Sequence, residues 1–194
     1  MGYIVGVDEV GRGCLAGPLL VVAARQKTDL PKGLRDSKLL SRKQRLELLK
    51  LLNNCCDFGE GWVKAVEIDR IGLGKALRIG VRRALNGLII NSDEKIIIDG
   101  KVNYVPKKFR NSKCVIGADN LVPIVSAASI YAKVTRDNFM SELAKKHPKY
   151  GFDKHVGYAT AGHLEALQSF GSLKRIHRQF FQPVRQLKLF PREV

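Results

Sequence analysis

Four carboxylates of this chain stand where short apolar segments end. They are Asp8 and Glu9 after YIVGV, Asp99 at the end of KIIID, and Asp119 after KCVIGA. An acid at the end of a buried strand can lie at the carboxyl edge of a sheet, where α/β folds place their ligands. Several acids that converge there repel one another unless a cation neutralises them, and Mg²⁺ prefers carboxylate oxygens. The spacing predicts a divalent-cation site, although any one of these acids taken alone could be a solvated strand end.

The charge of the chain indicates what such a site would act on. The sequence has 34 Lys and Arg against 18 Asp and Glu, which gives a formal charge of +16 and a pI near 9.9. A protein this basic is drawn to polyanions, of which nucleic acid is the commonest and an anionic membrane surface the weaker alternative. Two metal ions about 3.5–4 Å apart can clamp both the attacking and the leaving oxygen of a phosphodiester. The acids and the positive charge together favour metal-dependent cleavage of nucleic acid.

Three further patterns could bear on a site. The segment Gly11-Arg12-Gly13 lets backbone approach a ligand closely, because glycine has no Cβ, although spacing alone favours an ordinary turn. Asp137 could be a metal ligand, but an ion pair with Lys133 one helical turn away is the simpler interpretation. The histidines have no zinc-site spacing and are expected on loops and helix surfaces. They are His147, His155, His163 and His177.

The elements that must position these residues follow from apolar periodicity. Short β-branched and apolar runs predict strands at 3–8, 19–24, 57–66, 95–99 and 113–117. Apolar residues at helical spacing predict helices at 41–53, 67–88, 123–147 and 160–170, with a loop at 149–158 and a basic tail opened by Pro183. Strands come first and are mixed with helices later, so the predicted class is α/β with one mixed sheet.

Several classes of protein are excluded by composition. The longest uncharged runs, 13–24 and 120–132, are shorter than the roughly 20 residues that a membrane-spanning helix needs. The N-terminus has no basic region before its apolar residues, and we do not expect a signal peptide. The four cysteines have no C-x-x-C spacing, which predicts a cytoplasmic protein without a disulfide framework.

The chain closely resembles type 2 ribonuclease H, the ribonuclease HII family. The matching stretches lie in the family's order over nearly the whole chain: VDEVGRGCLAGP (7–18), DSKLLS (36–41), VEIDRIGLGKAL (66–77), IIIDG (96–100), ADNLVPIVSAASIYAKVTRD (118–137), HPKYGFDKHVGYAT (147–160) followed by His163, and HRQFFQPV (177–184). The resemblance implies a ribonuclease H-like fold, a mixed five-stranded sheet flanked by helices with a helical C-terminal part. It further implies a catalytic core over 1–145, a helical region over 146–184 that completes the substrate groove, and a basic tail over 185–194.

The resemblance also assigns roles to individual residues. It implies that the four carboxylates Asp8, Glu9, Asp99 and Asp119 are the catalytic metal ligands, although IGAD before Asp119 departs from the family's usual sequence. It implies that the backbone of Gly11, Arg12 and Gly13 reads the ribose 2′-OH, the group by which a protein distinguishes RNA from DNA. Tyr158 matches the family's junction-sensing tyrosine, with loop packing as the alternative, and Lys38 matches a position near the substrate phosphates.

The expected function follows from these assignments. We expect a monomeric endonuclease, dependent on Mg²⁺ or Mn²⁺, that cuts the RNA strand of RNA/DNA hybrids and incises DNA 5′ to an embedded ribonucleotide. Its products would carry a 3′-hydroxyl and a 5′-phosphate, and its roles would be ribonucleotide excision repair and RNA primer removal. Type 3 is not expected, because only seven residues precede Asp8. The alternatives are a binding module that has lost the chemistry and another polynucleotidyl hydrolase or transferase of the same fold.

The tail carries a separate motif. Gln186, Leu187, Leu189 and Phe190 resemble the pentapeptide that binds the bacterial sliding clamp, with Lys188 as a departure at the middle position. An exposed end could insert its Leu and Phe into a groove as apolar anchors. The alternative is that these two side chains pack back onto the enzyme.

Overall fold

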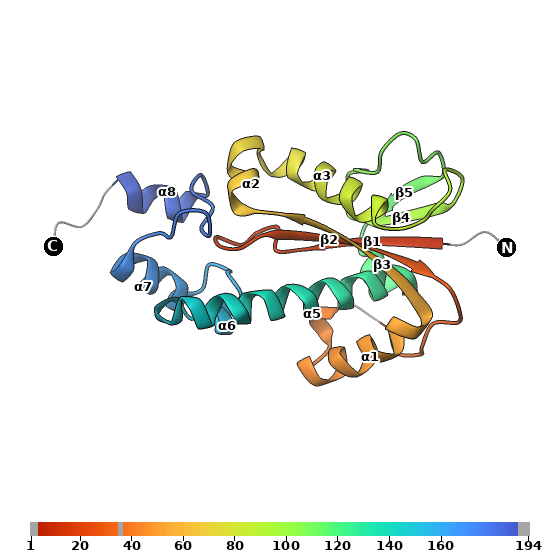
Figure 1. The fold of residues 1–194 in the computed structure, drawn as a ribbon, viewed down its shortest axis with the longest axis horizontal. Coiled ribbons are helices and arrows are strands. Elements are labelled where there is room, and N and C mark those ends of the chain that lie inside the picture. Colours follow the sequence, from red (N-terminus) through yellow and green to blue (C-terminus); the bar gives the residue numbers. More distant parts are fainter. Residues whose placement is uncertain (1–3, 35–36, 190–194) are drawn as a thin grey trace. The chain divides into compact units, whose positions relative to one another are not determined.

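The computed structural model describes residues 4–34 and 37–189, which form two compact units (Figure 1). One unit comprises residues 1–10, 20–62 and 77–135, and the other comprises 11–19, 63–76 and 136–194, each range taken where it is described. The expected boundaries after residues 145 and 184 separate a catalytic core, a helical region and a tail by their functional roles, whereas these two units are defined by their contacts. The expected boundaries stay a prediction. Among the described residues no helix is long and apolar enough to cross a membrane.

The first unit is built on a mixed five-stranded sheet in the order β3-β2-β1-β4-β5. Strand β1 (Ile4–Val10) pairs antiparallel with β2 (Leu19–Gln26) and parallel with β4 (Lys95–Asp99). Strand β4 pairs parallel with β5 (Ser112–Val115), and β3 (Cys56–Val63) lies at the other edge. The central strands are almost continuously apolar because both of their faces are buried. The predicted fold class is confirmed.

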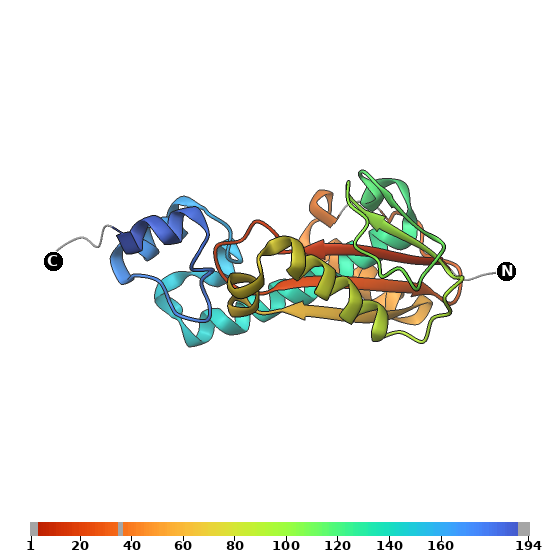
Figure 2. The same ribbon diagram turned by 90° about the horizontal axis from the view of Figure 1, so that it is seen from above.

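Helices cover both faces of this sheet, with α3 (Leu73–Asn86) on one face and α1 (Arg42–Cys55) and α5 (Pro123–Lys146) on the other (Figures 1 and 2). Helix α1 begins with the capping box that Ser41 and Gln44 predict. Gly6 lets β1 approach the start of α5 closely, since a Cβ there would lie 2.5 Å from the Ile124 carbonyl group. The layers bury a core that includes residues of β2, β4 and α5.

The helices differ from the sequence-based expectation at 67–88 and near the C-terminus. The single helix predicted over 67–88 is two helices, α2 (Ala65–Ile71) and α3, because Gly72 between them has φ 77°. The tail expected from Pro183 onward begins instead as helix α8 (Gln182–Leu189). Proline is tolerated in the first turn of a helix, where its missing N–H has no intrahelical partner to lose.

The second unit gathers short elements around the C-terminal half of α5. The predicted loop over 149–158 contains a 3₁₀ turn (Pro148–Tyr150) and helix α6 (Phe152–His155). Helix α7 (Ala161–Phe170) begins where Thr160 caps it, as predicted. The first unit also contains two short connecting elements, helix α4 (Ala118–Leu121) and a 3₁₀ turn (Ser37–Leu39). The loop 11–19 belongs to this second unit and pairs with residues 176–178 at its core.

Candidate active site

The four predicted acids lie on neighbouring elements of the first unit. The parallel register of β1 and β4 pairs Val7 with Ile98, so Asp8 and Asp99 are the next residues on two adjacent strands. The Asp99 carboxylate accepts a hydrogen bond of 2.7 Å from the backbone N–H of Ala118. That residue begins α4, whose second residue is Asp119. Asp99 ends β4 as expected, whereas Asp8 and Glu9 lie inside β1, just past the point where its pairing with β4 stops, and not at the end of the strand. The fold thus places Asp8 on the strand next to Asp99 and ties Asp99 to the segment that carries Asp119.

Electrostatics distinguish Asp8 from an ordinary surface acid. Its residue is 7% exposed, and burial together with the adjacent charges of Glu9 and Asp99 raises the pKa of its carboxyl to about 8. Hydrogen bonds from Ser129 and from the backbone N–H of Glu9 act in the opposite direction. A buried carboxylate beside like charges is stabilised by a bound cation, which offsets both its desolvation and the repulsion. The carboxylate oxygens of these acids and the unfavourable burial of the Asp8 charge fit a divalent metal ion.

The four predicted carboxylates do not form a complete set of metal ligands in the part of the chain that the structure describes. Within the described part of the chain, no group of three or more His, Cys, Asp or Glu side chains has the geometry to hold a metal ion. Asp119 is 6% exposed, and the hydroxyl of Ser126 donates to its backbone carbonyl at 2.7 Å. The four-carboxylate ligand set therefore stays a prediction, supported by proximity and electrostatics.

The segment Gly11-Arg12-Gly13 lies in the second unit, where two buried arginines, Arg136 and Arg178, contact it. Arg178 donates to the carbonyls of Gly11 and Arg12 at 2.6 and 2.8 Å. The Arg136 guanidinium lies against Gly11, which has φ 84°. Arg12 and Gly13 are exposed while Gly11 is buried, so the tip of the segment faces solvent.

Both arginines were missed from the sequence. A periodicity signal existed for Arg136, which falls one helical turn from each of two buried residues, Ala132 and Met140. Arg178 had no local signal, because its partners are backbone groups of a distant loop. Each arginine is 0% exposed, and its guanidinium donates to backbone carbonyls of the loop 11–18, so both buried charges have hydrogen-bond partners.

Tyr158 also belongs to the second unit. Its residue is 39% exposed, so part of the side chain is open to solvent. Its backbone carbonyl accepts from Nδ1 of His163 at 2.8 Å, and its N–H donates to the carbonyl of His155. The pKa of the Tyr158 phenol is raised above its ordinary value, mainly because part of the side chain is buried and to a lesser extent because Cys14 lies nearby. The backbone is fixed while the ring stays accessible.

The histidines correct an expectation. His155, His163 and His177 are buried rather than on surfaces, and they contact one another: the rings of His155 and His163 stack at 4.1 Å, and Nε2 of His163 lies 3.1 Å from Nε2 of His177. Each buried ring nitrogen in this group meets a polar partner, which compensates for the loss of water. Sequence spacing could not show this, because the three residues come from different segments.

Two predictions fall partly outside the described residues. The side chain of Lys38 is outside them, as are Phe190 and the side chains of Leu187 and Leu189. Gln186 is exposed on α8.

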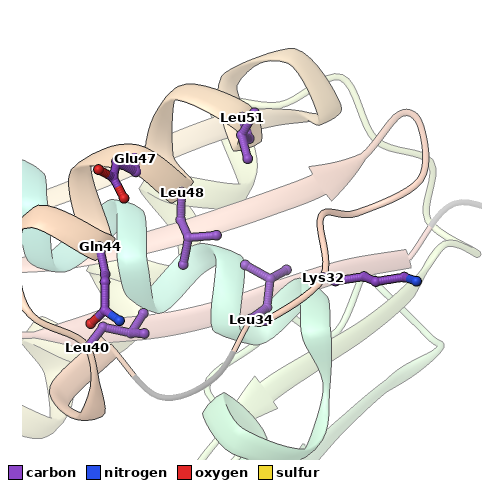
Figure 3. Close-up of a pocket in the computed structure, with 8 residues that line it drawn as sticks. Lys32, Leu34, Leu40, Gln44, Glu47, Leu48 and Leu51 are labelled. Carbon is purple, nitrogen blue, oxygen red and sulfur yellow. The ribbon is translucent and has the colours of Figure 1, made fainter.

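A pocket of about 480 Å³ lies between the loop at 32–34 and helix α1 (Figure 3). Leu34, Leu40 and Leu48 point toward it, and Lys32 and Glu47 stand at its border. None of the predicted site residues lines it.

Comparison with known proteins decides the family. The family model for ribonuclease HII matches residues 5–184. The chain belongs to the ribonuclease HII family. It is 44% identical over 189 residues to a ribonuclease HII of Coxiella burnetii (strain Dugway 5J108-111), covering 96% of this chain and 92% of that protein. A ribonuclease HII of Parvibaculum lavamentivorans is 44% identical over 187 residues, covering 95% of this chain and 68% of the relative.

Solved structures agree with the assignment. Ribonuclease H2 from Pyrococcus horikoshii OT3 superposes with a TM-score of 0.78 at 28% identity, covering 98% of this chain and 100% of that one. RNase HII from Archaeoglobus fulgidus, solved in complex with PCNA, gives a TM-score of 0.72 at 25% identity over 92% of this chain and 95% of that one. The resemblance stated from the sequence is confirmed: this member of the ribonuclease HII family has the ribonuclease H-like fold and is a ribonuclease H that acts on RNA/DNA hybrids.

Proposed function

We propose that this ribonuclease H requires Mg²⁺ or Mn²⁺ and, besides cutting the RNA strand of hybrids, incises duplex DNA 5′ to a single embedded ribonucleotide. The observation that carries the metal requirement is Asp8, a buried carboxylate on β1 beside the charges of Glu9 and Asp99. A relative of the same fold, Bst-RNase HIII, has been solved in complex with Mn²⁺. The products carry a 3′-hydroxyl and a 5′-phosphate, and the roles are ribonucleotide excision repair and RNA primer removal.

Asp8, Glu9, Asp99 and Asp119 would hold the metal, two ions per site during catalysis. Bound divalent ions supply activation of the attacking water and stabilisation of the leaving 3′-oxygen. The chain's own contribution is to fix the carboxylates: the Ala118 N–H holds Asp99, and the Glu9 N–H holds Asp8. Without these bonds each carboxylate would lose orientation, which phosphodiester chemistry tolerates poorly.

Specificity for ribonucleotides is assigned to the second unit. The exposed tip of Gly11-Arg12-Gly13 offers backbone donors and acceptors to the ribose 2′-OH, which is itself both donor and acceptor. The partly exposed ring of Tyr158 can stack on the deoxyribose that follows and leave no room for a 2′-OH there. The charge of +16 holds the phosphates, with Lys38 among the contributing cations.

The test is a cleavage assay on three labelled duplexes: DNA with one ribonucleotide, all-DNA, and an RNA/DNA hybrid, each with Mg²⁺, Mn²⁺ or EDTA. We expect metal-dependent incision 5′ to the ribonucleotide, no cutting of all-DNA, and loss of both activities in Asp99→Asn with duplex binding retained. Cleavage of all-DNA would instead support a general polynucleotidyl hydrolase. Binding of the wild type without any cleavage, falling with salt and unchanged by Asp99→Asn, would support a binding module.

We also propose that the tail binds the bacterial sliding clamp through Gln186, Leu187, Leu189 and Phe190. The Archaeoglobus fulgidus RNase HII was solved with PCNA, a clamp of another domain of life, which supports a clamp interaction only in general. Deletion of 186–194 should abolish clamp pull-down and leave activity on short duplexes intact. Arg185→Ala, on the exposed face of α8 and outside the motif, is the matched control and should retain binding. Persistent pull-down by the deleted protein would reject the proposal.

Two expectations about the whole protein remain predictions. A cytoplasmic location is favoured by the cysteines Cys14, Cys55, Cys56 and Cys114, which are thiols rather than disulfides. A monomer is expected from the sequence, and light scattering of the purified protein measures it directly.

A further inference from the structure

His177 lies directly after a turn and pairs with the loop that follows the Gly11-Arg12-Gly13 segment. The N–H of Gly17 donates to the carbonyl of Ile176 at 2.8 Å, and the N–H of Arg178 donates to the carbonyl of Leu15 at 2.7 Å. Ala16 and His177 form the antiparallel bridge between them. Side chains of successive residues at a β-bridge point to opposite sides. His177 and Arg178 are therefore directed to different parts of the second unit.

The Arg178 side chain is directed to the glycine-arginine-glycine segment. Its guanidinium binds the carbonyls of Gly11 and Arg12, and its Nε lies 3.3 Å from the carbonyl of Gly17. Burial lowers the pKa of this guanidinium to about 10, so the side chain still carries its charge at neutral pH. A charged, planar donor that binds successive carbonyls fixes the orientation of the peptide planes between them.

The His177 side chain is directed to Tyr158 through His163. The N–H of Leu173 donates to Nδ1 of His177, so the proton of this ring is on Nε2. Nδ1 of His163 donates to the Tyr158 carbonyl, which leaves Nε2 of His163 to accept from His177 at 3.1 Å. Both tautomers are fixed by neighbours at their other nitrogen. The chain of bonds from Leu173 to Tyr158 therefore fixes the backbone that carries the tyrosine.

We propose that His177 and Arg178 are a pair of positioning residues for substrate specificity: Arg178 orients the segment that reads the 2′-OH, and His177 orients Tyr158. This inference rests on the proposed function, which assigns ribonucleotide reading to those two elements. Neither residue needs to touch the substrate. All of the contacts that carry the inference lie within the second unit.

The test compares kcat and KM on DNA with one ribonucleotide and on an RNA/DNA hybrid. Arg178→Met removes every donor and should lower kcat on both substrates by roughly ten- to a hundredfold. Arg178→Lys keeps a cation that can reach one carbonyl and should recover part of this loss. His177→Leu removes the donor to His163 and should lower cleavage of the single-ribonucleotide duplex more than that of the hybrid, because only the former depends wholly on the RNA-to-DNA step. His177→Gln keeps a donor and should restore the wild-type ratio.

The control for stability is Leu85→Ala, a cavity variant in the core of the first unit. It should lower the melting temperature while leaving the ratio of the two activities unchanged. If His177→Leu and Arg178→Met change both activities only in proportion to folded fraction, as Leu85→Ala does, the inference is wrong and the two residues are merely structural. If the wild type itself shows no preference for ribonucleotides, the proposed function fails instead, and the two failures are thereby distinguished.

Discussion

Gly11 and Gly13 occupy the same short segment, but a single added methyl group should destabilise the protein only at Gly11. A Cβ at Gly11 would lie 2.8 Å from Cζ of Arg136 and 2.9 Å from the carbonyl of Pro18, and closer still to Nε of Arg136. The guanidinium cannot move aside at low cost, because its nitrogens donate to the carbonyls of Pro18, Val156 and Ala16. Nothing lies within 4 Å of a Cβ built at Gly13.

The magnitude for Gly11→Ala follows from two terms. The left-handed backbone at φ 84° costs an L-residue about 1–2 kcal/mol, and overpacking against a fixed neighbour costs about 1–3 kcal/mol. The sum of roughly 2–5 kcal/mol corresponds to a fall in melting temperature of roughly 4–20 °C for a domain of this size. Gly13→Ala should change stability by less than about 0.5 kcal/mol.

Thermal and urea denaturation of both variants would measure these differences, with cleavage of the single-ribonucleotide duplex assayed below each melting point. Gly13→Ala should be folded like the wild type yet cut ribonucleotides more slowly, because its methyl group stands where backbone must approach the ribose. Gly11→Ala should lose stability as well as activity. A Gly11→Ala protein as stable as the wild type would refute the packing argument, and a fully active Gly13→Ala would refute the assignment of the exposed tip to substrate.

Two further predictions concern stability. Glu94→Ala breaks the bidentate pair in which Arg25 donates to both oxygens of a nearly buried carboxylate, and it should cost about 3 kcal/mol in urea denaturation, whereas Lys145→Ala, in a surface pair, should cost less than about 1 kcal/mol. Burial lowers the pKa of His163 and of His177 to about 4, below the 6.5 of the unfolded chain, so the unfolded state takes up more protons between these values. Stability should therefore be complete above about pH 6.5 and fall as the pH drops toward 4, by about 1.4 kcal/mol per pH unit for each histidine that titrates in this way. Urea denaturation at pH 7 and pH 5 measures the slope, which His177→Gln should reduce; an equal slope in that variant would show that other groups cause it.

Much of the first unit could be predicted from local pattern. Apolar runs predicted β1 and β4, and Asp99 ends β4 as expected, because a strand buried on both faces favours charged groups at its termini; β1, however, continues past Asp8 and Glu9 to Val10. The capping box at Ser41 predicted where α1 begins. In both cases the deciding interactions are within a few residues along the chain, so the sequence contains them.

The buried polar side chains of the second unit could not be predicted from the sequence, because they depend on tertiary contacts. Arg178, His163 and His177 are polar, and a local pattern assigns such residues to the surface, where water satisfies them. Here their partners are backbone groups of the loop 11–17 and of residues 158 and 173, which approach only after the chain has folded. The sequence alone determined the family and the sheet, and it singled out the acids Asp8 and Asp99 on neighbouring strands. Tertiary structure decided which polar side chains are buried, because a buried donor is stable only where a distant acceptor meets it.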